Sequence, residues 1–167
     1  MKLPVIRNLL TGLMLCFCMY AMAQDQPTFE DMSVNKDSLA KLLNAYSFKR
    51  YYLPTRFPAA FIDKQNKVYR IPYEETILAF VDLSAGDECK YGLAFGLKGM
   101  YVNNAGLSTS RGPRYISYTV YKNNELRQII KKEFQIEFKA IEIKHLEKEE
   151  QAILEKILRE IKSKLLK

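Results

Sequence analysis

Soon after residue 33, apolar residues recur at the spacing of an amphipathic helix. Asn35 or Asp37 can cap the start of this helix, because either side chain accepts a hydrogen bond from a backbone N–H group. We expect the helix to end near Phe48, before Pro54 and Pro58 break regular structure. Its apolar positions share one face: Leu39, Leu42, Leu43 and Tyr46.

A second, longer amphipathic pattern covers residues 146–166. Glu155 with Arg159, and Glu160 with Lys164, have the favourable order for ion pairs at four-residue spacing. A helix this apolar on one side must cover its own sheet or a partner helix. The uncovered face of the preceding strands favours its own sheet. The apolar positions of this helix are Ile153, Leu154, Ile157, Leu158, Ile161 and Leu165.

Between the two helices the pattern changes to that of β-strands. Gly99 supplies the positive φ of a tight turn between two of these strands. The aromatic, proline-punctuated segment 51–62 is expected to pack against the sheet. We expect strands over five ranges: 68–71, 76–83, 91–97, 100–103 and 115–121.

Further along the chain the pattern predicts a long loop at 104–114. Residues 126–130 fit a strand or a helix, whereas 134–138 alternate as a strand, with a bulge suggested at 140–141. The fold class predicted for residues 34–167 is a single α+β domain: a small antiparallel, curved sheet or barrel with an N-terminal helix and a C-terminal amphipathic capping helix.

The N-terminus has the order of a secretory signal peptide. Lys2 and Arg7 are followed by an apolar run at residues 9–20 and by a small-residue site ending at Ala23. The run is shorter than the roughly 20 residues that span a bilayer, which disfavours an uncleaved anchor. A lipoprotein signal is disfavoured because bulky residues precede the cysteines at 16 and 18. We expect an exported protein, periplasmic or secreted, with residues 24–33 as a flexible lead-in.

Charge and cysteine content refine this picture. Cleavage after Ala23 removes two of the positive charges that give the chain its net +7, and so leaves +5. Only Cys89 of the three cysteines would remain, so no intramolecular disulfide can form. We interpret Cys89 as a small buried hydrophobe, with intermolecular pairing as the alternative. With 48% hydrophobic residues, the chain can build a core without cross-links.

Three stretches of the central region resemble a recurring pattern in bacterial pleckstrin-homology-like (PH-like) domains. Residues 71–82 read Ile-Pro-Tyr-Glu-Glu-Thr-Ile-Leu-Ala-Phe-Val-Asp, followed by Gly-Leu-Ala-Phe at 92–95 and Lys-Gly-Met-Tyr at 98–101. In that family, an Ile-Pro pair and an acidic residue lead into the first buried strand. The resemblance covers about residues 69–102 and implies a PH-like fold, but it implies no activity.

The family's better-known members hold phosphoinositide headgroups with basic residues near the loop between the first two strands. Here that loop is 84–90, with Asp87, Glu88 and a single lysine, Lys90. Acidic side chains repel anionic oxygens, which argues against headgroup binding at this loop.

Catalytic motifs are weak in this sequence. His145 is the only histidine, which excludes a histidine-rich metal site. Asp82, Asp87 and Glu88 lack the ligand spacing of a calcium loop. Residues 108–110 offer hydroxyl groups without a nucleophile motif or a base, and the chain has no glycine-rich phosphate loop. We therefore predict no catalytic residues, no cofactor and no metal.

Three functional hypotheses follow. The first is a non-catalytic binding or scaffolding domain that engages a protein or cell-envelope partner through a sheet edge, the 104–114 loop or the last helix. The second is a module for anionic membrane surfaces, and the third is an enzyme of unrecognised type. Export argues against nucleic acid as a partner. The membrane hypothesis uses a candidate basic patch: Lys90, Lys98, Arg111, Arg114 and Lys122.

Overall fold

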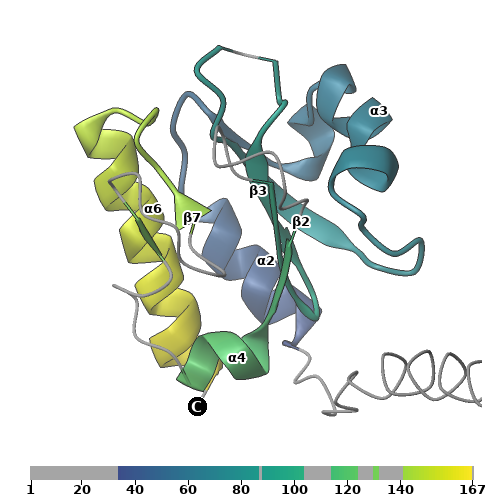
Figure 1. Cartoon of the computed structure of the whole chain (residues 1–167). Helices are drawn as coiled ribbons and strands as arrows, with labels where there is room; N and C mark the ends of the chain where they lie inside the picture. The colour runs from purple at the N-terminus through teal and green to yellow at the C-terminus, as the bar shows by residue number, and fades with distance from the viewer. Residues whose placement is uncertain (1–33, 87, 104–113, 124–129, 132–140, 167) are drawn as a thin grey trace, which may run out of the picture. The chain divides into compact units, whose positions relative to one another are not determined.

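A computed structural model describes residues 34–86, 88–103, 114–123, 130–131 and 141–166. These residues form an α+β fold, as predicted, in which helices lie on both sides of an antiparallel sheet (Figure 1). The strands are β1 (Tyr51–Tyr52), β2 (Ile77–Asp82), β3 (Gly92–Gly96), β4 (Gly99–Asn103), β5 (Arg114–Ser117), β6 (Ile130–Lys131) and β7 (Ile141–Glu142). The helices are α2 (Lys36–Asn44), η1 (Pro54–Arg56), α3 (Ala59–Val68), α4 (Tyr118–Asn123), α6 (Lys148–Glu160) and η2 (Ile161–Leu165).

The main sheet has five strands in the order β1-β2-β3-β4-β5, and each neighbouring pair is antiparallel. These five strands do not close into a barrel. A register shift between Ile77 and Ala79 lets Leu78 and Ala79 both face the larger core. β6 and β7 form a separate parallel pair.

One face of the sheet carries the larger core, which is mainly aliphatic and includes residues of α2 and α6. Because the apolar face of α6 is buried in this core, the helix is covered by its own chain, as the sequence favoured. This burial supplies much of the hydrophobic stabilisation of the fold. Fully buried members include Leu39, Leu43, Val81, Leu93, Met100, Leu154 and Ile157.

The other face carries a smaller, aromatic core beneath α3. The ring of Phe61 stacks on Phe80 with 4.0 Å between centroids, and Tyr69 meets both rings edge-on. Tyr51 and Tyr52 join the sheet as β1. The predicted packing of segment 51–62 against the sheet is confirmed, although the pattern did not predict α3.

Both amphipathic helices are confirmed, with shorter bounds than expected. Asn35 caps α2 through a 3.0 Å hydrogen bond from the Ser38 N–H group, and the helix ends at Asn44 rather than near Phe48. In α6, Glu147 and Glu150 form a reciprocal capping box. The regular part of α6 ends at Glu160.

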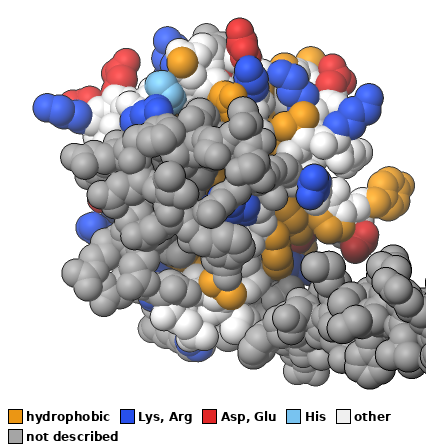
Figure 2. All heavy atoms as spheres, viewed as in Figure 1, with side chains coloured by type: hydrophobic (Ala, Val, Ile, Leu, Met, Phe, Trp, Pro, Cys, Tyr) orange, Lys and Arg blue, Asp and Glu red, His pale blue; other side chains and the backbone are white. Residues whose placement is uncertain are grey.

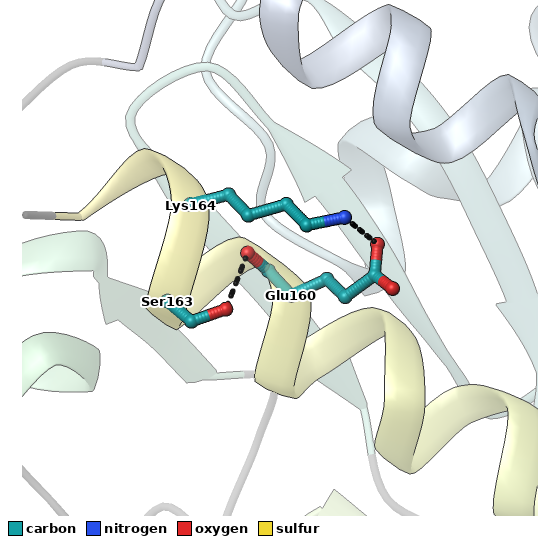
Figure 3. Close-up of polar contacts among 3 residues, drawn as sticks. All are labelled: Glu160, Ser163 and Lys164. Carbon is teal, nitrogen blue, oxygen red and sulfur yellow. Dashed lines mark hydrogen bonds and ion pairs between the residues drawn. The ribbon is translucent and has the colours of Figure 1, made fainter.

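The final turn, η2, has π-helical geometry. The predicted pairs are present, because Arg159 lies 3.5 Å from Glu155 and Lys164 lies 2.8 Å from Glu160. Ser163 also donates to the Glu160 carbonyl at 3.5 Å (Figure 3). Hydrogen bonds from Lys164 and then from Tyr46 lower the pKa of Glu160, so this carboxylate links the helix end to the chain that follows α2.

Two expected strand ranges are wrong. Residues 68–71 do not form a strand, because α3 continues to Val68 and a turn with Arg70 at φ 51° follows. The range 115–121 is a strand only as far as Ser117, since α4 begins at Tyr118. The alternation of Ile116, Tyr118 and Val120 therefore reflects their packing in or against one core, although the first belongs to a strand and the other two to a helix.

Gly99 is required for a different reason from the one predicted. Its φ lies outside the left-handed region, but a Cβ atom there would lie 2.4 Å from the Ile116 carbonyl oxygen. The glycine therefore allows β4 and β5 to approach closely.

Several predicted features lie outside the described residues. They are the signal peptide and lead-in up to residue 33, the loop at 104–113, and the strand at 134–138. Of the ambiguous range 126–130, Ile130 belongs to β6, and Ile141, the second residue of the suggested bulge, begins β7.

Candidate binding surface

Glu75 organises the connection between α3 and β2. Its backbone N–H group closes a turn onto the Pro72 carbonyl at 3.1 Å. Its carboxylate accepts hydrogen bonds from the N–H groups of Thr76 (3.0 Å) and Leu97 (2.8 Å). The Tyr101 hydroxyl donates a further bond of 2.9 Å to the same carboxylate. One side chain thus fixes the 72–76 turn to the β3–β4 hairpin.

Gly96 makes this arrangement possible. A Cβ atom at this position would lie 2.8 Å from the carboxyl carbon of Glu75, closer than packing allows. Burial, together with the hydrogen bond to Glu75, raises the pKa of Tyr101. Its hydroxyl therefore remains a protonated donor at neutral pH, and the link is stable there.

The turn held by Glu75 presents a tyrosine to solvent. Tyr73 is 99% exposed, whereas Tyr115 is 37% exposed. The Tyr115 ring lies 5.0 Å from that of Tyr101, and its hydroxyl donates to the Lys98 carbonyl at 2.9 Å. Figure 2 shows hydrophobic side chains at several separate places on the viewed face. Tyrosine is enriched among the residues that contribute most of the binding energy at protein interfaces.

Four elements meet at this end of the sheet, which we call the hairpin end (Figure 1). The Val34 N–H group, just before α2, donates to the Leu97 carbonyl at 3.0 Å, and the Tyr118 N–H group of α4 donates to the Lys98 carbonyl at 3.3 Å. Lys162 of η2 lies over the Tyr121 ring of α4, 5.9 Å from its centroid. The exposed or partly exposed side chains of the hairpin end are Lys36, Asp37, Tyr73, Glu74, Lys98, Tyr115 and Lys122.

The residues of the predicted basic patch lie at two places. Lys98 and Lys122 belong to the hairpin end, whereas Lys90 lies at the opposite end of β3. Arg114 pairs with Val102, near that opposite end, and Arg111 lies outside the described residues. The structure thus brings Lys98 and Lys122 to one end and separates them from Lys90 and Arg114.

Of the acidic residues considered for a cation, Asp82 organises the 83–91 loop. Asp82 is fully buried, and its carboxylate accepts from the N–H groups of Ser84 (2.8 Å) and Cys89 (3.4 Å). Glu88 is exposed, and residue 87 is not described. Among the described residues, no group of three His, Cys, Asp or Glu side chains could hold a metal ion.

Other candidate residues are also placed. Cys89 is 1% exposed, which confirms that it is buried, and it has a left-handed φ of 47°. The Tyr69 hydroxyl donates to its carbonyl at 3.0 Å. His145 is partly buried just before α6, and the hydroxyl residues at 108–110 are not described.

Sequence reasoning did not identify Tyr73 and Glu75 as site residues, although both lie within the stretches that carry the family resemblance. The only signal available was the pairing of an acidic residue before the first buried strand with a tyrosine in the third stretch. Comparison with protein-family models, curated proteins and solved structures finds no match. In the part of the chain that the structure describes, no helix is long and apolar enough to cross a membrane.

Proposed function

We propose that this chain is an exported, non-catalytic binding or scaffolding domain that engages a component of the cell envelope through its hairpin end. The observation that carries the proposal is the exposure of Tyr73 on a turn that Glu75 holds in place. A fully exposed side chain gains nothing for folding, and a turn whose backbone is already held loses little conformational entropy when a partner covers it.

We also propose kinship with bacterial PH-like domains. Residues from the stretches that carry the resemblance contact one another, since the Glu75 carboxylate accepts a hydrogen bond from Tyr101. The amphipathic C-terminal helix after the strands agrees in order and type. Two features depart from the family pattern: the described strands do not close into a barrel, and loop 84–90 is acidic.

A crystal structure of the chain after residue 23 tests this kinship. Strands at 104–113 or 132–140 that extend the sheet toward closure would support it. Helices in both segments would contradict the proposed kinship.

Export is the part of the proposal that depends on the N-terminal pattern alone. Mass spectrometry of the protein secreted by its own cells tests it directly. We expect a chain that begins at Gln24, and an intact N-terminus would contradict cleavage.

Co-sedimentation with a washed envelope fraction tests the binding role. We expect the chain that begins at Gln24 to sediment with the envelope, and Tyr73→Ala to reduce the bound fraction several-fold. Ile62→Ala is the matched control, because Ile62 is 50% exposed on α3, away from the 72–76 turn. Equal binding by both variants, or no binding by the unmodified protein, would contradict the proposal.

A further inference from the structure

We infer that the hairpin end opens and closes as one cooperative unit, in which a change at the 72–76 turn reaches α4 and the residue before α2. The inference concerns motion within the chain, so it holds or fails independently of the proposed partner. It depends on the hydrogen bonds that Gly96, Leu97 and Lys98, the tip of the β3–β4 hairpin, make to other segments.

Tyr118, the first residue of α4, binds this tip through two of its groups. Its hydroxyl donates to the Gly96 carbonyl at 2.8 Å, and its N–H group donates to the Lys98 carbonyl at 3.3 Å. The Lys98 carbonyl also accepts a 2.9 Å bond from the Tyr115 hydroxyl of β5. The position of the tip and the start of α4 therefore depend on each other.

Leu97, in the middle of the tip, joins two further segments. Its N–H group donates to the Glu75 carboxylate at 2.8 Å, which ties the 72–76 turn to the tip. Its carbonyl accepts a 3.0 Å bond from the N–H group of Val34, just before α2. A displacement of Leu97 therefore weakens the attachment of both segments at once.

Neither α4 nor the 72–76 turn can keep its conformation without the tip. α4 has six residues, and isolated helices of this length are unstable in water. The 72–76 turn belongs to no helix or strand, and Glu75 is the residue that ties it to the sheet. Because Tyr118 is fully buried, water cannot replace a bond that it loses, so we expect the bonds of the tip to break together.

The 83–91 loop at the other end of β2 is held by a different carboxylate. Asp82 accepts hydrogen bonds there from the N–H groups of Ser84 and Cys89. Native proteins open locally in contiguous units whose stabilities differ. We therefore expect the hairpin end to open while this loop stays closed, and the loop serves as the internal reference.

Amide hydrogen exchange of the free protein tests the inference. Tyr118→Phe keeps the ring and removes only the hydroxyl that binds the tip. We expect exchange at the Leu97 and Thr76 amides, neither of which is bonded to Tyr118, to accelerate about fivefold or more. Tyr121→Phe is the matched control, because it removes a hydroxyl from a second buried tyrosine of α4 that has no hydrogen-bond partner among the described residues. It should leave exchange at both amides unchanged or slower.

Glu75→Ala tests the same coupling from the other side. If one opening exposes the whole unit, exchange at the Tyr118 and Val34 amides accelerates by the same factor as exchange at Leu97. Neither Tyr118 nor Val34 donates its N–H group to Glu75, since their acceptors are carbonyls of the tip. Glu74→Ala, one residue earlier and exposed, is the control and should change none of these rates.

Two outcomes would overturn the inference. Acceleration confined to the bonds of the substituted residue would show that the segments open separately, and equal acceleration at Ser84 and Cys89 would show that the whole sheet opens. Circular dichroism checks that each variant folds, and Glu75→Ala, at a partly exposed position, keeps the test available if Tyr118→Phe does not fold. All measurements are made without a partner, so a failure of envelope binding leaves this result unaffected.

Discussion

At each end of β2, a carboxylate side chain accepts hydrogen bonds from backbone N–H groups, but the two carboxylates have opposite effects on the exposure of neighbouring side chains. At one end, the buried carboxylate of Asp82 gathers backbone N–H groups of the 83–91 loop and draws the loop inward around Cys89. At the other end, the carboxylate of Glu75 gathers backbone N–H groups and the Tyr101 hydroxyl, but the turn that it fixes points Tyr73 outward. A carboxylate next to a strand therefore does not by itself indicate a catalytic or metal-binding site. The two ends differ in whether the side chains of the connection held by the carboxylate are buried or exposed to solvent.

Removal of α6 has the largest expected effect, because both ends are built on the core that this helix completes. Leu154, Ile157, Leu158 and Ile161 are fully buried. Burial of each is worth about 1.5–3 kcal/mol, and their sum matches the total stability of a typical domain, about 5–15 kcal/mol. We expect a chain that stops at His145 to show no cooperative thermal unfolding by circular dichroism. A retained cooperative transition would show that the helix is not part of the core.

Asp82→Ala should cost the next largest amount, about 2–4 kcal/mol of unfolding free energy. The substitution leaves two buried N–H groups without acceptors, and each costs about 1–3 kcal/mol. Urea denaturation measures the loss, and Asp82→Asn, which keeps one acceptor oxygen, should recover part of it. If Asp82→Ala and Asp82→Asn unfold like the unmodified protein, Asp82 does not organise the 83–91 loop.

Glu75→Ala should cost less, about 1–2 kcal/mol, because two of its partners, Thr76 and Leu97, are only partly buried and water can replace the carboxylate there. Its distinctive effect is on the turn: amide exchange at Leu97 and Thr76 should accelerate. Glu74→Ala is the control and should change neither stability nor exchange. Unchanged amide exchange in Glu75→Ala would show that Glu75 does not hold the turn in place.

Tyr121→Phe should have the smallest effect and the opposite sign. The Tyr121 hydroxyl is buried and has no hydrogen-bond partner among the described residues, so the substitution removes an unsatisfied group with little loss of packing. We expect stability to rise by up to about 1 kcal/mol in urea denaturation. A loss of more than about 1 kcal/mol would reveal a partner for this hydroxyl in solution.

The hydrophobic periodicity of the sequence predicted those elements in which buried residues recur at the spacing of a helix or of a strand. The amphipathic helices and the runs that became β2, β3 and β4 are of this kind. It failed at Tyr118, where the apolar alternation of a strand continues into a short helix. It also missed α3, whose single fully buried residue, Phe61, leaves almost no stripe to detect.

The candidate binding surface was harder to predict than the fold. A lysine's neighbours depend on which strand ends meet, so the sequence could not separate Lys98 from Lys90. The exposure of Tyr73 depends on the long-range bond between Glu75 and Leu97. No local pattern encodes such a bond, and Glu75 was visible beforehand only as part of a family resemblance.

Hydrogen–deuterium exchange of the protein with and without its envelope fraction tests the central claim most directly. If the hairpin end is the binding surface, protection appears at residues 72–76 and 96–98, while the 83–91 loop exchanges as it does in the free protein. Protection of the 83–91 loop instead, or equal protection at both ends of the sheet, would contradict the account.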